Sequence, residues 1–137
     1  MTALTNYTEN QILSHIFRTG TFTKPATLAI GLATAMADGE AGTFTEVTGG
    51  SYARVARNPL DANWDAAVGN NGTTANSASI QFPTATADWG TVTHFVIYDA
   101  STVGNALIYA ALTNARTITN GTTASFAAGA LTFQIDN

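Results

Sequence analysis

The sequence predicts a mainly β protein: an antiparallel β-sandwich of the jelly-roll type, preceded by one N-terminal α-helix. Three observations lead to this fold class. Apolar residues at helical spacing occur in the first twenty residues. From Pro25 onwards, about seven or eight short segments alternate apolar and polar residues with a period of two, and turn residues separate them. Threonine, which is β-branched and suits exposed sheet faces, supplies 24 of the 137 residues.

The size of the chain fits one domain. Its 137 residues have a mass of 14.2 kDa, which is enough to bury a core without disulfides. The sequence contains no cysteine. We therefore expect a single domain over 1–137, in which 1–20 form a helical arm and 21–137 form the sandwich.

The predicted helix spans about 6–18. Asn6 and Glu9 have the spacing of a capping box, and Gly20 is a natural stop. The apolar stripe of this helix needs a partner, either the chain's own sheet or a neighbouring subunit. The residues near helical spacing are Leu4, Tyr7, Ile12, Leu13, Ile16 and Phe17.

The strands are identified by period-two alternation. Two of them, 92–98 and 106–112, are apolar on both faces and are expected at the centre of a sheet. In the first of these, the even-numbered residues are expected to share one face. Pro83 is expected to end the strand before it. The expected strands are 26–33, 52–57, 77–82, 92–98, 106–112 and 131–135.

Glycine and asparagine mark the connections between the strands. A polar loop is expected at 35–50, and turns are expected at 99–105 and 120–121. The stretch 61–76 is either a short hairpin or a plain loop around the turn signal at 69–72.

The charge composition excludes several classes of function. Charged residues make up 10% of the chain, against about 25% in typical domains. The five basic residues are scattered and the net charge is −4, so we expect no nucleic-acid partner. We expect no membrane span, because no run of about 18 apolar residues occurs. The first residues also lack the basic and apolar parts of a secretory signal.

The surface composition favours a component of an assembly over a free monomeric enzyme. Alanine and threonine together supply over a third of the residues. A surface of these residues lacks the charges that normally protect edge strands. We infer that other subunits cover much of it.

The pattern of titratable residues predicts no catalysis, cofactor or metal site. His94 lies on an expected strand without a nucleophile or carboxylate beside it, and His15 lacks the second histidine of a zinc helix. The acidic loop with Asp38, Glu40 and Glu46 lacks the spacing of a calcium loop. The sequence leaves open whether a cation is bound between subunits.

Trp64 and Trp89 each lie in an expected loop beside an aspartate. An exposed loop tryptophan can stack on a sugar, which would make a carbohydrate-binding site. The favoured interpretation is that each indole closes an end of the sandwich or a subunit contact.

Three segments carry a resemblance: TEVTGGSYAR at 45–54, IQFPTATADWGTVTHF at 80–95 and FAAGAL at 126–131. In these segments the chain resembles the small virion proteins of tailed bacteriophages commonly labelled "phage tail fiber protein". The resemblance extends over nearly the whole chain and supplies no catalytic residues. The sequence departs from the family's pattern at Ser51, where glycine is common, and at 34–38, where a proline-containing turn is typical.

The resemblance implies a non-enzymatic structural protein of the virion. The first interpretation is a capsid cement or decoration protein that clamps neighbouring capsomers on the outer shell. Its partners would be the major capsid protein and further copies of itself, as a dimer or trimer. The alternative is a tail or fibre-base protein that recognises host glycan through its tryptophans. The candidate contact residues are Leu13, Ile16, Phe17, Glu46, Tyr52, Arg54, Trp64 and Trp89.

Overall fold

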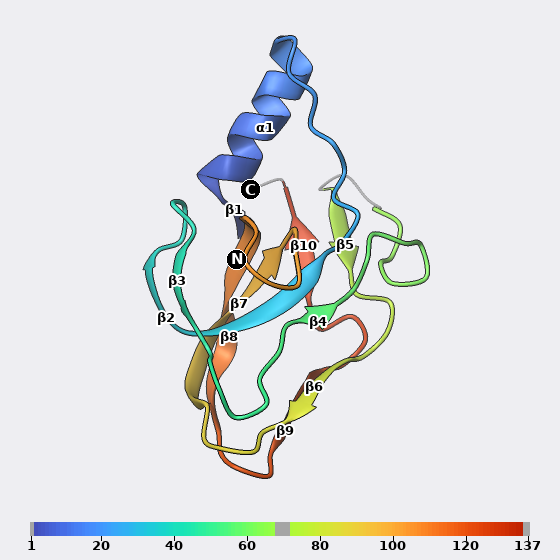
Figure 1. Ribbon diagram of the computed structural model, residues 1–137. Coiled ribbons are helices and arrows are strands. Elements are labelled where there is room, and N and C mark those ends of the chain that lie inside the picture. Colours follow the sequence, from blue (N-terminus) through green and yellow to red (C-terminus); the bar gives the residue numbers. More distant parts are fainter. Residues whose placement is uncertain (1, 68–71, 136–137) are drawn as a thin grey trace.

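The computed structural model describes residues 2–67 and 72–135 and contains one helix and ten strands in these ranges (Figure 1). The helix in these ranges does not have the length and apolar character needed to cross a membrane. In chain order the elements are β1 (Thr2–Leu4), α1 (Asn6–Phe17), β2 (Ala29–Asp38), β3 (Thr43–Glu46), β4 (Val55–Ala56), β5 (Thr73–Ala75), β6 (Ile80–Thr84), β7 (Gly90–Tyr98), β8 (Ala106–Ile118), β9 (Thr123–Phe126) and β10 (Thr132–Gln134).

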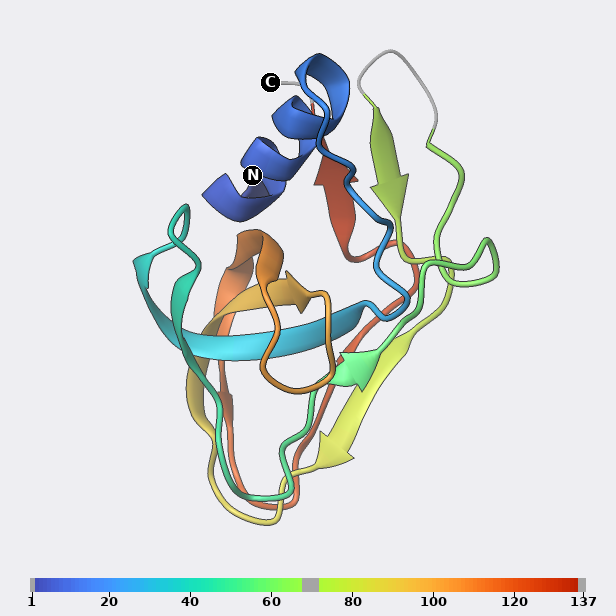
Figure 2. The same ribbon diagram turned by 45° about the horizontal axis from the view of Figure 1, so that its top comes forward.

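The strands form one large antiparallel sheet and two small ones. The large sheet has the order β1-β8-β7-β2-β3, and β4 also pairs with β2. The small sheets are β5–β10 and β6–β9. Figures 1 and 2 show α1 at one end of the β body and the β8–β9 connection at the other. The predicted fold class, mainly antiparallel β with one N-terminal helix, is confirmed.

The main core joins residues of the large sheet to residues of the two small sheets. Phe95 of β7 makes edge-on contacts with Phe126 of β9 and with Phe133 of β10, at ring-centroid distances of 5.9 and 6.0 Å. Full burial of such side chains stabilises the fold by about 1.5–3 kcal/mol each. A second, smaller cluster contains Ala33, Val96, Tyr98 and Ala106. The main cluster includes Ile30, Leu32, Ile80, Phe82, Val92, Phe95, Ile97, Leu131 and Phe133.

The position of β7 at the centre of the large sheet is confirmed. The expectation that its even-numbered residues share one face is wrong at Val92. The pairing of β7 with β8 shifts in register between Val92 and His94. Because a bulge reverses the alternation beyond it, Val92 joins Phe95 and Ile97 in the main cluster. Val96 and Tyr98 belong to the second cluster. An unbroken alternation would have placed Val92 on the same face as these two residues.

Several boundaries also differ from those expected. The loop at 35–50 is wrong in part, because β2 continues to Asp38 and β3 follows it in a hairpin. Strand β8 continues to Ile118, beyond 112, while the strand at 52–57 shrinks to β4. Strands β1 and β9 were not expected, since three- and four-residue segments are too short to show a period. The turn signal at 69–72 falls largely on residues outside the described ranges.

Two expectations at the small sheets are wrong for local reasons. Pro83 does not end β6, because β6 is paired with β9 alone in the described ranges and an unpaired strand edge tolerates a missing N–H. The strand expected at 131–135 is too long at its end, because β10 ends at Gln134 and Ile135 beyond it is exposed. Leu131 and Phe133 are buried.

The helix matches the predicted range within one residue, but its cap does not. Thr5, rather than Asn6, is the N-cap, and its Oγ1 accepts the Thr8 N–H at 3.4 Å. The same hydroxyl donates to the Ala106 carbonyl at 2.6 Å, and Thr8 Oγ1 donates to the Leu107 carbonyl at 2.9 Å. These bonds fix the first turn of α1 to β8. The arm at 1–20 therefore begins with a strand of the large sheet.

Candidate functional site

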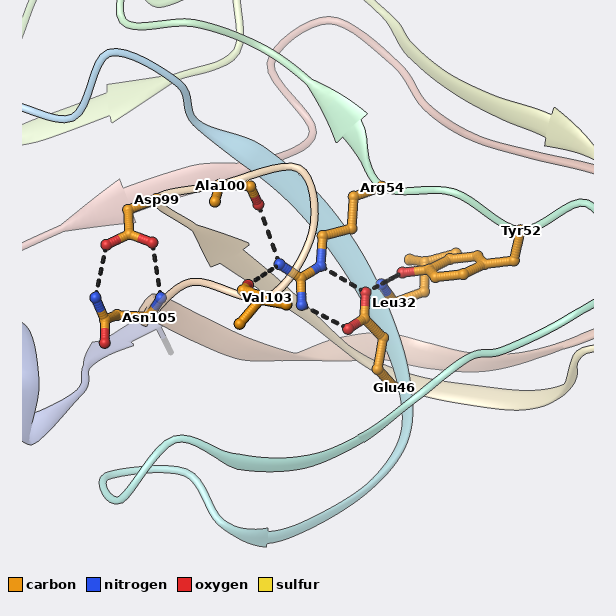
Figure 3. A network of polar contacts seen from close by, with 8 residues as sticks. All are labelled: Leu32, Glu46, Tyr52, Arg54, Asp99, Ala100, Val103 and Asn105. Carbon is orange, nitrogen blue, oxygen red and sulfur yellow. Dashed lines mark hydrogen bonds and ion pairs between the residues drawn. The ribbon is translucent and has the colours of Figure 1, made fainter.

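Three of the predicted contact residues come together, although the chain between them is a loop. Glu46 ends β3, and Tyr52 and Arg54 lie in the segment that leads to β4. Arg54 donates from Nε to Glu46 Oε1 and from Nη2 to Glu46 Oε2, both at 2.7 Å (Figure 3). Such a two-pronged ion pair fixes both side chains in one geometry. The side chains are only 8% and 23% exposed, respectively, for Arg54 and Glu46.

The rest of the Arg54 guanidinium holds the turn between β7 and β8. Its Nη1 donates to the carbonyls of Ala100 and Val103, at 3.0 and 2.6 Å (Figure 3). Its Cζ lies 3.3 Å from the centre of the Tyr98 ring, a cation–π contact. Asp99 closes the same turn by accepting two hydrogen bonds from Asn105. Arg54 therefore ties this turn to β3.

Tyr52 completes the network from the side of the core. Its hydroxyl donates to Glu46 Oε1 and accepts the Leu32 N–H, both at 2.8 Å. Burial raises the pKa of Tyr52 well above its ordinary value, and the negative charge of Glu46 adds to this effect. Gly31 makes the arrangement possible: a Cβ there would lie 2.9 Å from the Tyr98 ring and 3.0 Å from Glu46 Oε1.

The network is suited to holding loops rather than to binding or catalysis. The Glu46 carboxylate accepts from Arg54 and from the Tyr52 hydroxyl, and the Arg54 guanidinium donates to Glu46 and to two backbone carbonyls, so both groups are already paired. In the ranges that the structure describes, no three His, Cys, Asp or Glu residues lie close enough to hold a metal ion. His94 shares a hydrogen bond with the Thr93 hydroxyl, and His15 Nδ1 accepts the Phe22 N–H at 3.4 Å.

Trp89 is packed inside the protein, as the favoured interpretation of this residue expects. It is 5% exposed, its Nε1 donates to the Gly50 carbonyl at 2.9 Å, and its ring meets the Tyr52 ring edge-on at 5.3 Å. A sugar has no access to this indole. Of the two tryptophans, Trp64 is therefore the better candidate for a glycan contact.

The turn that Trp89 holds has an unusual backbone. Gly49, Gly50 and Ser51 all have positive φ, at 73°, 52° and 62°. This conformation suits glycine and costs a residue with a side chain about 1–2 kcal/mol. Ser51 Oγ shares a hydrogen bond with Thr86 Oγ1 at 2.9 Å. A strained serine thus occupies the position at which the resembling proteins commonly have glycine.

Substitutions at Ser51 should separate the strain from the hydrogen bond. Ser51→Ala loses the hydrogen bond and keeps the strain, whereas Ser51→Gly loses the bond and relieves the strain. We expect Ser51→Gly to be more stable than Ser51→Ala by about 1 kcal/mol. Urea unfolding of both variants measures the difference. Equal free energies of unfolding would show that the positive φ at 51 carries no strain.

Trp64 lies in a different environment, beside an open groove of about 720 Å³. Its ring packs edge-on against Phe133 at 5.6 Å, and its Nε1 donates to the carbonyls of Arg57 and Asn58 at 3.1 and 3.2 Å. The indole is half-buried, and the exposed carboxylates of Asp61 and Asp65 lie at the same groove. The other lining residues include Leu28, Leu60, Thr74, Ser77, Ile97 and Ile108.

The sequence pointed to Trp64 but not to the groove around it. The lining comes from the segments before β2, between β4 and β5 and between β5 and β6, and from strands β5, β7, β8 and β10. No spacing in the sequence links these segments. The Asp-flanked tryptophan was the single local signal.

The remaining predicted contact residues, Leu13, Ile16 and Phe17, lie on α1 and are exposed. They are far along the helix from its cap at Thr5, where the bonds to β8 are made. The predicted contact residues thus fall into three places: the Glu46–Arg54 network with Trp89, the Trp64 groove, and the end of α1.

Comparison with known proteins gives one family. The family model described as "Podophage GP4 fiber I protein gp80" matches residues 3–134. The match includes the helix and all three motif segments. No curated protein matches the chain.

Proposed function

Because the chain belongs to the Podophage GP4 fiber I protein gp80 family, a family of phage fibre proteins, we propose that it is a fibre component of the virion whose Trp64 groove contacts glycan on the host surface. The family supports a structural virion protein and a fibre rather than capsid cement. It therefore favours the alternative interpretation of the sequence over the first one. Binding to the major capsid protein belongs to the first interpretation and stays a prediction.

The Trp64 groove is the observation that carries the glycan contact. Sugars present apolar C–H faces, which pack on aromatic rings, and hydroxyl groups, which donate to carboxylates. The groove offers one half-buried indole with Asp61 and Asp65 beside it. Its volume of about 720 Å³ is in the range of small-molecule sites.

The indole is also held in place before any ligand arrives. The carbonyls of Arg57 and Asn58 accept its N–H, and Phe133 supports its ring. A side chain that is already ordered loses little conformational entropy on binding. This favours Trp64 as the stacking surface for a sugar ring.

Binding to surface polysaccharide purified from the bacterial host, measured by titration calorimetry, tests the groove. We expect Trp64→Ala to weaken binding at least tenfold, because it removes the stacking surface. Asp61→Ala, at an exposed position, should weaken binding without disturbing the packing of Trp64 on Phe133. Val103→Ala is the control, since Val103 is exposed and outside the groove.

The outcomes separate the possibilities clearly. If the unaltered protein binds no host polysaccharide, the glycan contact is wrong. If Trp64→Ala and Asp61→Ala bind as well as the unaltered protein, the contact lies elsewhere.

The place of the protein in the virion needs a separate measurement. Gold-labelled antibody against the chain should mark fibres on purified particles, and the copy number should be far below that of the major capsid protein. Label spread over the capsid, with a copy number close to that of the capsid protein, would restore the cement interpretation.

A further inference from the structure

Helix α1 presents an apolar stripe to solvent. Leu13, Ile16 and Phe17 are 54%, 62% and 76% exposed, and their spacing places them on one face. Thr8 is the one buried residue of this helix. A 12-residue helix is marginally stable in water unless an apolar face is packed. The exposed stripe therefore indicates a contact that the single chain does not supply.

This chain contacts α1 in two places outside the stripe. Its first turn is bonded to β8 through Thr5 and Thr8. The segment that returns from the helix lies along a second side: Gly20 is close to Ser14, and the Phe22 N–H donates to His15. Neither of these contacts covers the stripe, which stays exposed in the part of the chain that the structure describes.

The charges at the two ends of the stripe are opposite. Glu9 lies in the first turn of α1 and Arg18 is the C-cap residue, and both are exposed. The base of the helix also lies against the β2–β3 connection, where the Asn6 N–H donates to the Glu40 carbonyl at 2.8 Å. Asp38, at the end of β2, and Glu40, in this connection, are exposed. The base of the arm is therefore acidic, and its tip carries a cation.

The pKa of Tyr109 reflects the negative charge of these acidic residues. Burial raises the pKa of Tyr109, and the negative charges of Glu40, Asp38 and Glu9 raise it further. These charges make the base of the arm attractive to a cation.

We propose that α1 of one chain packs antiparallel against α1 of a second copy. In this orientation Leu13 lies near the centre of the pair, and Arg18 of each copy lies beside Glu9 and the acidic base of the other. A parallel pair would instead place Glu9 beside Glu9 and Arg18 beside Arg18, which is unfavourable. The inference concerns self-association and does not depend on the glycan groove.

The size of the helix sets the expected strength of the pair. A helix of 12 residues is about 18 Å long. Two such helices bury less than the roughly 800 Å² per partner of a standard interface. We therefore expect a weak dimer of the isolated protein, with a dissociation constant in the micromolar range, measured by sedimentation equilibrium.

Substitutions on the stripe and at its ends test the interface. Ile16→Asp should weaken self-association at least 100-fold, while Val103→Asp, at an 85% exposed position elsewhere, should leave it unchanged. Glu9→Arg and Arg18→Glu should each weaken the dimer several-fold, and the double variant should regain most of the loss. Restoration by the double variant distinguishes an ion pair between copies from simple loss of helix stability.

Cross-linking tests the orientation, because the chain has no cysteine of its own. Asn10 and Ile16 lie at matching distances on either side of Leu13. In an antiparallel pair, a mixture of Asn10→Cys and Ile16→Cys chains should form a disulfide-linked dimer faster than either variant alone. Faster linkage of Ile16→Cys with itself would overturn the antiparallel arrangement. A protein that stays monomeric up to about 1 mM would overturn the proposal as a whole.

Discussion

Glu46→Ala is expected to lower the free energy of unfolding by about 3–5 kcal/mol, because it leaves the buried guanidinium of Arg54 without its counter-charge. The Arg54 side chain is 8% exposed and gives two of its hydrogen bonds to Glu46. Tyr52 loses its acceptor in the same variant. Urea unfolding followed by tryptophan fluorescence measures the change.

Two further variants show where this cost arises. Glu40→Ala, at an exposed glutamate, should change stability by less than about 0.5 kcal/mol. The double variant Glu46→Leu with Arg54→Met should regain most of the loss, because an apolar pair leaves no buried charge uncompensated. A loss below about 1 kcal/mol for Glu46→Ala would mean that the ion pair behaves as a surface pair.

The sequence predicts the central strands and the helix well because these elements have enough residues to show a period. The strand at 92–98 is apolar on both faces and lies at the centre of the large sheet, as β7. The short strands β1 and β9 show no such period. Pro83 illustrates a different limit: its effect depends on which strand edge is paired, and this is decided by the tertiary structure.

The two tryptophans show why the sites were harder to predict than the fold. Each has an aspartate as neighbour in the sequence. Trp89 is buried against Tyr52, whereas Trp64 lies half-buried at a groove. The difference comes from strands far away in the chain, so local sequence cannot reveal it. In the same way, the 45–54 motif marks Glu46 and Arg54 but not the carbonyls of Ala100 and Val103 that Arg54 also binds.

Raising the pH above about 10 is expected to destabilise the protein through Tyr98 and Tyr52. Burial raises the pKa of Tyr98 from 10.0 to about 12, the charge of Glu46 adds to this, and the Arg54 cation opposes it. Burial raises the pKa of Tyr52 in the same direction. The folded state therefore holds these phenol protons more tightly than the unfolded state does.

The sign of the effect follows from this difference. Below pH 10 both states keep the protons, and the contribution of the phenols to stability is fully present. Between pH 10 and about 12 the unfolded state loses the Tyr98 proton while the folded state retains it, so unfolding becomes more favourable as pH rises. For Tyr98 alone the loss is on the order of 2–3 kcal/mol by pH 12. Urea unfolding at a series of pH values above 9 measures it.

Tyr98→Phe provides the matched comparison for this pH dependence. The variant keeps an aromatic ring beneath the Arg54 guanidinium but has no phenol to ionise. Its stability should therefore fall less steeply with pH than that of the unaltered protein, and the remaining slope should include the contribution of Tyr52. Identical slopes for the two proteins would contradict the assignment of the alkaline loss to Tyr98. The tyrosinate absorbance of the folded protein gives an independent check, because the Tyr98 phenol of the folded state should ionise near pH 12 rather than near pH 10.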